Sequence, residues 1–415
     1  MKVLVIGKGG REHAICHKLS FSKYKPIIYC APGNGGTRIY NNIDIKENDV
    51  NKLLEFALKE KIDLTIVGPE ETLSLGIVDI FKKNNLKIFG PTLKASRIET
   101  SKEFMKNLMI KYNIPTAKYK VFTNFNDGIS YLKEVNYPMV LKYDGLAFGK
   151  GVIICNNYNE AYLNLDNMLN KKIFGNSSVI IEEYLEGLEF SLMAFVNKDK
   201  IFYMDSVQDH KKAFDNNLGT NTGGMGCYSK VDFLNYDDLN ESYKIMKDTC
   251  LALVKEDSSF TGILYGGLMK TDKGIKVIEF NCRFGDPETE VILPRLENDL
   301  IDVINDVLDY KDVNLKFKNI YTLGVVLASK GYPNKYDKGY EINIEDDNNI
   351  NNLIYHMGTI YKNNKLSTNG GRVLICIGYG NTLKIARDNA YNIVNKINCD
   401  NLFYRKDIGF QGLKE

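Results

Sequence analysis

The sequence predicts a mixed α/β and α+β protein with an amino-terminal doubly wound parallel sheet, a larger central part and a small α+β carboxy-terminal domain. Up to about residue 100, short β-branched runs alternate with amphipathic helical stretches, as in parallel sheets covered by helices. From Ser101 the pattern changes, and a charged linker at 311–318 precedes the last strands. We expect domains at 1–105, 106–310 and 311–415, with a mobile flap subdomain at about 119–190.

Composition narrows the class of protein. The chain has 415 residues, of which 44% are hydrophobic and 26% are charged, and this is ordinary globular composition. Its net charge of +2 gives no reason to expect nucleic acid or an anionic membrane as a partner. Because the chain has no long apolar run and begins directly with a charged-flanked strand, we expect neither a signal peptide nor a transmembrane helix.

The eight cysteines are scattered singly, and no Cys-x-x-Cys pair occurs. This spacing argues against zinc and redox motifs. Most of the cysteines lie in apolar segments and are interpreted as small core residues in a reducing cytoplasm.

The first strand, residues 2–6, runs into a glycine-rich turn and a helix at about 12–22. Close backbone N–H groups and a helix amino terminus suit an anion. A dinucleotide fingerprint would need a glycine where Glu12 stands and an acid ending the second strand, which instead ends in Cys30-Ala31-Pro32. We therefore predict a phosphate or small-anion site with Arg11 as its partner; the alternative is a plain tight turn.

Two further units repeat this pattern. Strands at 63–67 and 86–89 each run into a Gly-Pro turn, and helical patterns at 50–59 and 73–84 lie between them. Alternating elements of this kind predict a parallel sheet whose ligands bind at the carboxyl ends of the strands.

The central part begins with a helix at 101–112, capped by Ser101, and continues with strands at 119–122 and 137–142 around a helix near 127–134. Lys142 ends the second of these strands, and Lys150 lies in the glycine-rich stretch that follows. Such a stretch supplies backbone N–H groups to phosphates, and lysines supply charge. It is not a P-loop, since Val152 follows Gly151.

Acidic residues then mark a strand at 178–184, which ends in Glu182-Glu183, while Glu189 opens the next strand at 190–196. Acids beside a nucleotide pocket can accept ribose hydroxyls or orient an adenine amine. The alternative is an edge strand with solvated charges.

A polar quartet around His210 and a glycine-rich loop at 221–226 have the pattern of a substrate loop. A structural role for His210 is at least as well supported as a proton carrier. A long helix at 236–255 and a hairpin of strands 263–270 and 275–280 follow.

The hairpin delivers Glu279, Asn281 and Arg283 at alternating positions, so their side chains share one face. A carboxylate beside an amide oxygen suits Mg²⁺, which shares its shell with substrate phosphates. A guanidinium two residues on can grip a phosphate or carboxylate. This group of residues indicates phosphoryl transfer, against the alternative of a solvated strand end.

The tail contains a helix at 299–310, strands at 322–329 and 372–378, and a helix at 383–397. This order predicts the small carboxy-terminal α+β domain.

Taken together, these parts resemble the ATP-grasp superfamily, and over essentially the whole chain they resemble the phosphoribosylamine–glycine ligase family. The resemblance rests on stretches spread along the chain: Gly7-Lys8-Gly9-Gly10-Arg11-Glu12-His13-Ala14, Ile66-Val67-Gly68-Pro69-Glu70, Asp144-Gly145-Leu146-Ala147, Gln208-Asp209-His210-Lys211, Asn221-Thr222-Gly223-Gly224-Met225-Gly226, the ten residues from Glu279 to Glu288, Asn369-Gly370-Gly371-Arg372-Val373 and Arg405-Lys406-Asp407-Ile408-Gly409. It implies a central ATP-grasp fold.

The resemblance also implies an activity. ATP would convert the carboxylate of glycine to an acyl phosphate, and 5-phosphoribosylamine would attack it to give glycinamide ribonucleotide, ADP and phosphate, in de novo purine biosynthesis. The implied cofactor is Mg²⁺ or Mn²⁺ with ATP as co-substrate, and the implied partners are these small molecules alone. We expect a cytoplasmic monomer that binds neither nucleic acid nor membrane.

The resemblance assigns roles to particular residues. Catalysis would fall to Arg283, Asp209 and Asp286, and the metal to Glu279 and Asn281. Nucleotide binding would fall to Lys106, Lys142, Gly149, Lys150, Gly151, Glu182, Glu183 and Glu189. Substrate binding would fall to Gly9, Gly10, Arg11, Glu12, Gly223, Gly224 and Glu288.

Three positions depart from the family pattern: Tyr143 and Phe148 replace alanines of the flap, and Thr220 replaces a proline. They imply altered flap mobility or nucleotide affinity, while the charged residues remain. The alternative function is another ATP-grasp carboxylate–amine ligase or a biotin-carboxylase-like enzyme. A non-catalytic nucleotide-binding protein is disfavoured, because a binder need not keep the metal and transfer groups together.

Overall fold

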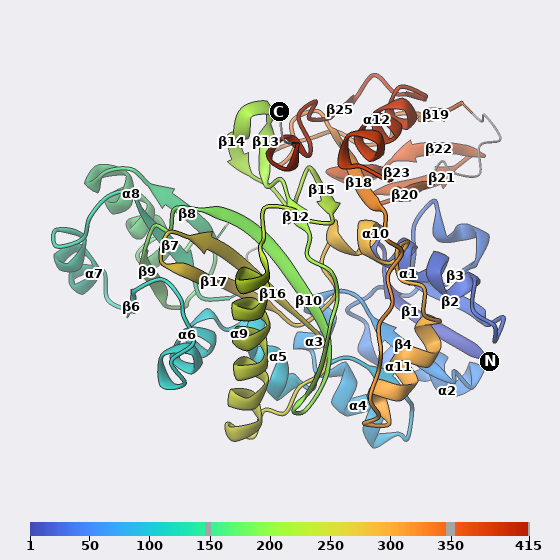
Figure 1. Ribbon diagram of the computed structural model, residues 1–415, viewed down its shortest axis with the longest axis horizontal. Helices are drawn as coiled ribbons and strands as arrows, with labels where there is room; N and C mark the ends of the chain where they lie inside the picture. Colours follow the sequence, from blue (N-terminus) through green and yellow to red (C-terminus); the bar gives the residue numbers. More distant parts are fainter. Residues whose placement is uncertain (146–150, 346–352, 414–415) are drawn as a thin grey trace.

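The computed structural model describes residues 1–145, 151–345 and 353–413. Phe148, Gly149 and Lys150 of the predicted flap lie outside these ranges. The described elements form four main sheets, and Figure 1 shows them as an amino-terminal part, a lobe set apart at the left, a central part and a carboxy-terminal part above.

The amino-terminal sheet is parallel throughout and has the strand order β3-β2-β1-β4-β5. Its strands are β1 (Lys2–Gly7), β2 (Ile27–Pro32), β3 (Asn41–Asn42), β4 (Leu64–Val67) and β5 (Ile88–Phe89). The helices of this part are α1 (Gly10–Ser20), α2 (Val50–Glu60), α3 (Glu70–Ser74), α4 (Ile77–Lys83) and α5 (Leu93–Thr100), with η1 at Thr37–Ile39. The predicted doubly wound parallel sheet is confirmed.

One predicted helix of this part is wrong in detail. The stretch 73–84 is two helices, α3 and α4, separated at Gly76, whose φ of 75° lies in the left-handed region. A residue in that conformation cannot continue a right-handed helix, and glycine adopts it without steric cost.

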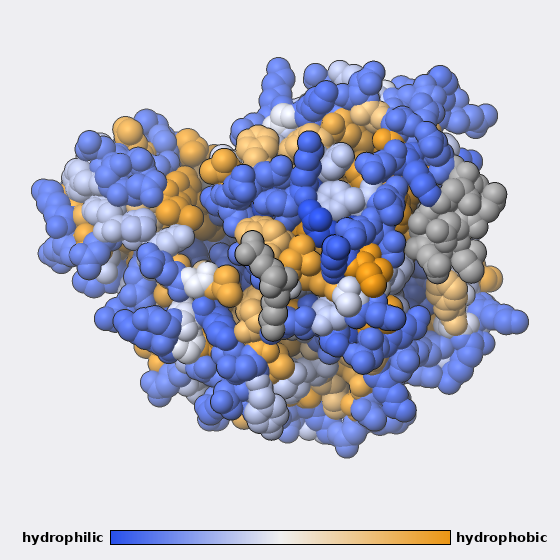
Figure 2. All heavy atoms as spheres, turned by 45° about the horizontal axis from the view of Figure 1, so that its top comes forward, coloured by the Kyte–Doolittle hydropathy of each residue, from blue (hydrophilic) through white to orange (hydrophobic). Residues whose placement is uncertain are grey.

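The lobe at the left of Figure 1 is an antiparallel sheet of order β6-β9-β7-β8 with two helices and a hydrophobic cluster of its own. Its elements are β6 (Tyr119–Phe122), α7 (Phe125–Leu132), β7 (Met139–Tyr143), β8 (Val152–Cys155), α8 (Tyr158–Leu169) and β9 (Val179–Glu183). Figure 2 shows an indentation between this lobe and the rest of a largely hydrophilic surface. Helix α8 was not predicted from the sequence.

The central sheet is antiparallel and has the order β11-β10-β16-β17. It consists of β10 (Leu188–Asn197), β11 (Lys200–Tyr203), β16 (Thr261–Thr271) and β17 (Gly274–Asn281), with α6 (Lys102–Lys111) and α9 (Tyr236–Lys255) beside it. Ser101 caps α6 as predicted, its Oγ accepting from the Phe104 N–H. The predicted hairpin ending at the Glu279 stretch is confirmed as β16–β17.

The carboxy-terminal sheet has the order β12-β15-β18-β23-β20, and β25 also pairs with β18. Its strands are β12 (Gln208–Asp209), β15 (Gly226–Ser229), β18 (Tyr321–Ser329), β20 (Leu353–His356), β23 (Arg372–Gly380) and β25 (Leu402–Phe403). Because β12 and β15 come from the centre of the chain, this sheet joins residues about 100 positions or more apart. The exact domain boundaries stay a prediction.

Smaller elements complete the chain: η2 (Asp215–Asn217), the hairpin β13 (Lys212–Phe214) and β14 (Leu218–Asn221), α10 (Glu288–Ile292), α11 (Leu300–Leu308), β19 (Asn343–Ile344), β21 (Thr359–Lys362), β22 (Lys365–Thr368), α12 (Leu383–Val394), β24 (Ile397–Asn398) and η3 (Phe410–Gly412). All eight cysteines are free, and seven of them are buried. Within the described ranges, no helix combines the length and apolarity needed to cross a membrane.

Histidines join the amino-terminal part to the carboxy-terminal sheet. The Nδ1 of His13, on α1, accepts from the backbone N–H of His356, at a distance of 2.9 Å. One turn further along the helix, the Nδ1 of His17 lies 3.0 Å from the Tyr355 hydroxyl. These contacts place the start of α1, and with it the glycine-rich turn, against β20.

Candidate active site

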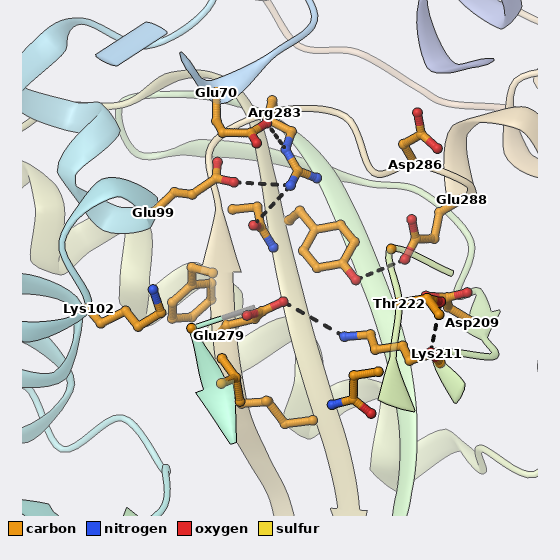
Figure 3. A pocket seen from close by; sticks show the side chains of 18 of the residues that line it. Glu70, Glu99, Lys102, Asp209, Lys211, Thr222, Glu279, Arg283, Asp286 and Glu288 are labelled. Carbon is orange, nitrogen blue, oxygen red and sulfur yellow. Dashed lines mark hydrogen bonds and ion pairs between the residues drawn. The ribbon is translucent and has the colours of Figure 1, made fainter. Parts of the chain in front are cut away.

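A cleft of about 700 Å³ lies where the amino-terminal, central and carboxy-terminal parts meet. Its walls come from the turn after β1, the inner faces of β7, β9 and β17, the segment between β12 and β15, and β23. Figure 3 shows the charged side chains that point into it. Ligands at the carboxyl ends of parallel strands and between facing sheets are the expected arrangement for such a fold.

The end of β17 presents the predicted metal-binding residues to the cleft. Glu279 and Asn281 lie two residues apart on one face of the strand, and Arg283 follows just beyond it. A β-bulge precedes them, because Gly267 pairs with Glu279 while Leu268 pairs with Val277. The bulge frees the carbonyl of Ile278, which accepts from the Lys142 ammonium at 3.1 Å.

Arg283 is held by acceptors on several sides. Its Nε lies 3.2 Å from Glu70 Oε2, and its Nη2 lies 3.1 Å from Glu99 Oε1 and 3.2 Å from Asn281 Oδ1 (Figure 3). Burial works to lower the pKa of Arg283, but Glu99 and Glu70 raise it well above its ordinary value. The guanidinium therefore sits in the cleft as a fixed charge.

Glu182 lies between two lysines. Its Oε2 is 2.6 Å from the ammonium of Lys106, and its Oε1 pairs with the ammonium of Lys142. Burial works to raise the pKa of Glu182, but the two lysines hold it below its ordinary value. Burial lowers the pKa of Lys106 to about 8 despite this pair. The carboxylate thus orders two cations at one wall of the cleft.

The two neighbouring acids of this wall, Glu183 and Glu189, have other partners. Glu183 pairs with Lys276 at 3.2 Å and accepts from the Lys118 N–H at 3.1 Å. Glu189 reaches Lys211 at 4.0 Å and is the most exposed of the three acids. Of the predicted nucleotide acids, it is the one whose carboxylate is least engaged by a cation.

Lys211 projects into the middle of the cleft between acids. Its Nζ lies 3.8 Å from Glu279 Oε1 (Figure 3). Burial works to lower the pKa of the Lys211 ammonium, but Tyr265 and Glu279 raise it well above its ordinary value. In turn, burial works to raise the pKa of Glu279, but Lys211 and Lys142 hold it below its ordinary value. Both groups are therefore charged at neutral pH.

The opposite wall carries several carboxyl groups close together. The Oδ1 of Asp209 is buried beside Gly224 and has no hydrogen-bond partner. Burial and the Glu288 carboxylate raise the pKa of Asp209 well above its ordinary value. Glu288 itself accepts from the Ser191 and Tyr265 hydroxyls at 3.0 and 2.9 Å. This wall suits a cationic or proton-donating ligand group.

The glycine-rich turn is organised by Glu12. Its Oε2 accepts from the Gly9 N–H at 2.6 Å, and its Oε1 lies 2.5 Å from the Nε of Arg11. Arg11 also donates to the Phe284 carbonyl at 3.1 Å. A Cβ on Gly68 would lie 1.8 Å from Glu12 Oε1, so the close approach of the neighbouring strand end requires glycine there.

The carboxy-terminal part supplies Arg372 to the cleft. Its Nη1 donates to the Gly223 carbonyl at 2.7 Å, and its Nη2 lies 2.8 Å from Asp286 Oδ1. The Gly223 N–H donates to the Tyr332 hydroxyl at 3.0 Å. The predicted substrate loop is thereby tied to β23 and to the turn after β18.

Most residues predicted from the sequence line this cleft: Gly9, Arg11, Glu12, Lys142, Gly151, Glu182, Glu183, Glu189, Asp209, Gly223, Glu279, Asn281, Arg283, Asp286 and Glu288. Lys106 lies behind Glu182, Gly10 packs on Glu290, and Gly224 packs on Asp209. Gly149 and Lys150 fall outside the described residues.

Several further residues line the cleft that were not among the predicted site residues, namely Glu70, Glu99, Lys102, Lys211, Tyr265, Tyr332 and Arg372. Glu70, Lys211 and Arg372 lie in stretches that carried the family resemblance, so a signal for them existed. Glu99 and Tyr265 lie within a helix and a strand and had no local signal.

The donor set at β17 fits a hard divalent cation. Glu279 is ionised and Asn281 offers an amide oxygen, and both residues line the cleft. Among the residues that the structure describes, no three His, Cys, Asp or Glu side chains are grouped to hold a metal by themselves. An ion here would take its remaining ligands from substrate phosphates and water.

Two antiparallel sheets facing each other across a cleft with paired lysines and a carboxylate–amide strand define an ATP-grasp protein. The models of the phosphoribosylglycinamide synthetase N domain, ATP-grasp (A) domain and C domain match residues 1–99, 100–289 and 322–411. The chain belongs to the phosphoribosylglycinamide synthetase family.

Individual proteins agree with this assignment. Phosphoribosylamine–glycine ligase of Halalkalibacterium halodurans is 48% identical, covering 100% of this chain and 98% of that protein. The crystal structure of the Thermotoga maritima phosphoribosylamine–glycine ligase is 33% identical and superposes with a TM-score of 0.87, covering 98% of this chain and 100% of that one. The biotin carboxylase domain of Hydrogenobacter thermophilus 2-oxoglutarate carboxylase, at 14% identity and a TM-score of 0.75 over 97% of this chain and 91% of that one, shares the fold.

Proposed function

We propose that this chain is an ATP-dependent carbon–nitrogen ligase that joins glycine to 5-phosphoribosylamine in de novo purine biosynthesis. The products are glycinamide ribonucleotide, ADP and phosphate. The family matches along the chain and the relatives named above support this proposal. The observation that carries it is the meeting of Glu279, Asn281 and Arg283 with Lys142 and Lys211 in one cleft.

The nucleotide would lie between the lobe and the central sheet. Lys142 would meet its phosphates, and Lys106 would support that charge through their shared partner, Glu182. Of Glu182 and Glu189, the two acids expected at the adenosine end, Glu189 has the freer carboxylate and stays our candidate, while Glu182 pairs with both lysines. Gly149, Lys150 and Gly151 would form the phosphate side of the flap, by family resemblance.

Glu279 and Asn281 would hold Mg²⁺ or Mn²⁺, which neutralises phosphate charge when bound. Lys211, beside Glu279, would add a fixed positive charge at the same place. Arg283, held by Glu70 and Glu99, would stabilise the phosphoryl group during transfer without having to reorganise.

The reaction would proceed in two steps. A carboxylate oxygen of glycine takes the γ-phosphoryl group of ATP, which releases ADP and forms glycyl phosphate. The amine nitrogen of 5-phosphoribosylamine then bonds to the carbonyl carbon, phosphate leaves with the bridging oxygen, and the amine loses a proton. Asp209, Asp286 and Glu288 are our candidates for holding the glycine ammonium, because their wall is rich in carboxyl groups.

The ribose phosphate would lie at the start of α1. Gly9, Gly10 and Glu12 shape that turn, and Arg11 offers a cation there. Gly223 and Gly224 would border the same substrate from the loop before β15. We propose a monomer, and the free cysteines fit a reducing cytoplasm.

The test is ADP release by the purified protein, with 5-phosphoribosylamine generated in the assay from ribose 5-phosphate and ammonia. We expect ADP release that needs both glycine and the amine, and a product with the mass of glycinamide ribonucleotide. ADP release that follows bicarbonate and ignores glycine would instead favour the biotin-carboxylase-like alternative. ADP release that accepts another amine in place of phosphoribosylamine would favour a different carboxylate–amine ligase.

A further inference from the structure

The segment between β12 and β15 projects from the cleft as a hairpin, and its two ends form part of the cleft wall. Lys211 precedes β13, and Thr222 follows β14. The base is closed by hydrogen bonds from the Thr222 N–H to the Lys211 carbonyl, at 2.7 Å, and from the Met225 N–H to the His210 carbonyl, at 2.9 Å. The position of Lys211 therefore depends on the position of this hairpin.

The carboxy-terminal segment 403–410, which the function proposed above leaves without a role, runs along the hairpin (Figure 1). Arg405 is 1% exposed and forms a two-point ion pair with Asp407, in which both N–O distances are 2.8 Å. Its other N–H groups donate to the Lys212 carbonyl and to Asn217 Oδ1, both at 3.1 Å. A buried bidentate guanidinium of this kind fixes geometry closely.

The contacts extend over the rest of the hairpin tip. Asp407 Oδ2 accepts from the Asn216 N–H at 2.8 Å. The Lys406 N–H donates to Asp215 Oδ1 at 2.7 Å. Residues 405–407 thus hold three consecutive residues of the tip as well as the first strand of the hairpin.

The base of the hairpin is held through His210. A carbonyl can only accept and a backbone N–H can only donate, so His210 Nδ1 donates to the Gly226 carbonyl and Nε2 accepts from the Gly409 N–H. This requires the neutral ring. Burial first, and Arg405 second, lower the pKa of His210 to about 3, which agrees. The geometry assigns His210 a structural role.

The tail is itself anchored on its other side. Arg387, on α12, donates to the carbonyls of Lys406 and Ile408, at 2.6 and 3.1 Å. The Tyr391 hydroxyl donates to the Arg405 carbonyl at 2.7 Å. A continuous set of hydrogen bonds therefore runs from α12 through the tail to the hairpin and to Lys211.

We propose that Arg405 and Asp407 are positioning residues for the active site: through the hairpin they hold Lys211 beside Glu279. Within the described residues, neither of them lines the cleft. Lys211 Nζ stands 3.8 Å from Glu279 and 4.0 Å from Glu189, so a small shift of the hairpin base removes its charge from both. The expected loss of kcat rests on the proposed function. The expected loosening of the hairpin rests on the contacts alone.

Two gentle variants test the proposal. Asn217 has a φ of 54°, so Asn217→Gly keeps the backbone conformation and removes only the acceptor that Arg405 uses. Arg405→Lys keeps the charge and loses the bidentate pair. We expect kcat to fall about tenfold for Arg405→Lys and severalfold for Asn217→Gly, with the KM for phosphoribosylamine within about twofold. The control is Lys365→Met, which breaks an exposed pair with Glu341 elsewhere in this part and should leave kcat unchanged.

A double-mutant cycle separates positioning from general destabilisation. If Arg405 acts through Lys211, Arg405→Lys should change kcat by less than about twofold in a Lys211→Met background. Losses that multiply in the double variant would overturn the proposal. The proposal would also be overturned if kcat fell in the Lys365→Met control too, in proportion to the fall in melting temperature across all the variants.

Hydrogen exchange gives a readout that does not need activity. In the Arg405→Lys and Asn217→Gly proteins, peptides covering 210–224 should exchange faster, while peptides from β1 and β4 should not change. Unchanged exchange at 210–224 would overturn the proposal even if ligase activity falls. If the wild-type chain lacks ligase activity, the proposed function fails, and the exchange experiment still decides whether the tail holds the hairpin.

Discussion

The Lys106 ammonium lies 2.6 Å from the Glu182 carboxylate, and their side chains are 0% and 5% exposed. The carboxylate stays ionised so far from water because a second ammonium, that of Lys142, also pairs with it. Removing one member of a buried charged group leaves the others unpaired, and this costs more than the pair itself contributes.

Glu182→Gln should therefore lower the free energy of unfolding by roughly 3 kcal/mol and raise the KM for ATP, since two ammonium groups lose their partner. Glu183→Gln is the matched control, one residue along the same strand, where the pair with Lys276 is part-exposed. It should change stability by less than about 1 kcal/mol. Urea unfolding compares the stability of the two variants, and ATP titration measures the KM of Glu182→Gln. Equal losses of stability in the two variants would contradict this account of Glu182.

Glu279→Gln tests the proposed metal strand. The side chain faces the cleft rather than the core, so the fold should persist. Turnover should fall about 10²-fold or more, because a preorganised charge at the reacting phosphates is lost. Turnover at saturating Mg²⁺ should be measured beside a melting curve. A folded variant with wild-type turnover would remove Glu279 from the metal site.

Arg11→Ala tests the phosphate-binding turn. The KM for phosphoribosylamine should rise about 10- to 100-fold, because a charged hydrogen bond worth roughly 1.5–3 kcal/mol is lost. The KM for ATP should change little. Lys8→Met is the control, since its exposed ammonium on the same turn pairs with Glu47. A larger effect on ATP than on phosphoribosylamine would show that the turn serves the nucleotide.

The buried His356 should make the folded protein less stable in acid. Burial lowers the pKa of His356 to about 4, below the ordinary 6.5 of the unfolded chain. A group with a depressed pKa in the folded state contributes stability above the unfolded value, and this is lost as pH falls from about 6.5 towards 4. For one such histidine the loss at pH 5 is on the order of 2 kcal/mol.

The measurement is the urea midpoint of the wild type and of His356→Gln at pH 7 and pH 5. Glutamine cannot take up a proton, so the variant should lose less stability between the two pH values than the wild type does. Parallel losses would show that His356 is not one of the groups responsible.

The sequence predicted the parallel sheet, the β16–β17 hairpin and the helix α9 well, because their hydrophobic patterns are local. It did not separate α3 from α4, since a glycine within an apolar pattern has the same appearance whether a helix continues or ends. Nor did it predict that β12 and β15 join the carboxy-terminal sheet, because pairing between strands so distant in the chain leaves no periodic signal.

For the candidate site, too, local features were predictable and long-range contacts were not. Charged residues beside glycines or at strand ends, such as Glu279 and Arg11, could be selected from the sequence. Glu99, which lies near the end of α5, contributes to the site only because α5 packs beside β17 and brings its carboxylate to Arg283. Partners of this kind depend on tertiary packing and could not be read from local spacing.

The central claim is that glycine is activated as an acyl phosphate in this cleft, and oxygen tracing tests it most directly. Glycine labelled with ¹⁸O in its carboxylate is incubated with ATP, phosphoribosylamine and the purified protein, and the released phosphate is analysed by mass spectrometry. The account predicts one ¹⁸O atom in each phosphate, because the carboxylate oxygen that took the phosphoryl group leaves with it. Product formation accompanied by unlabelled phosphate would contradict the account.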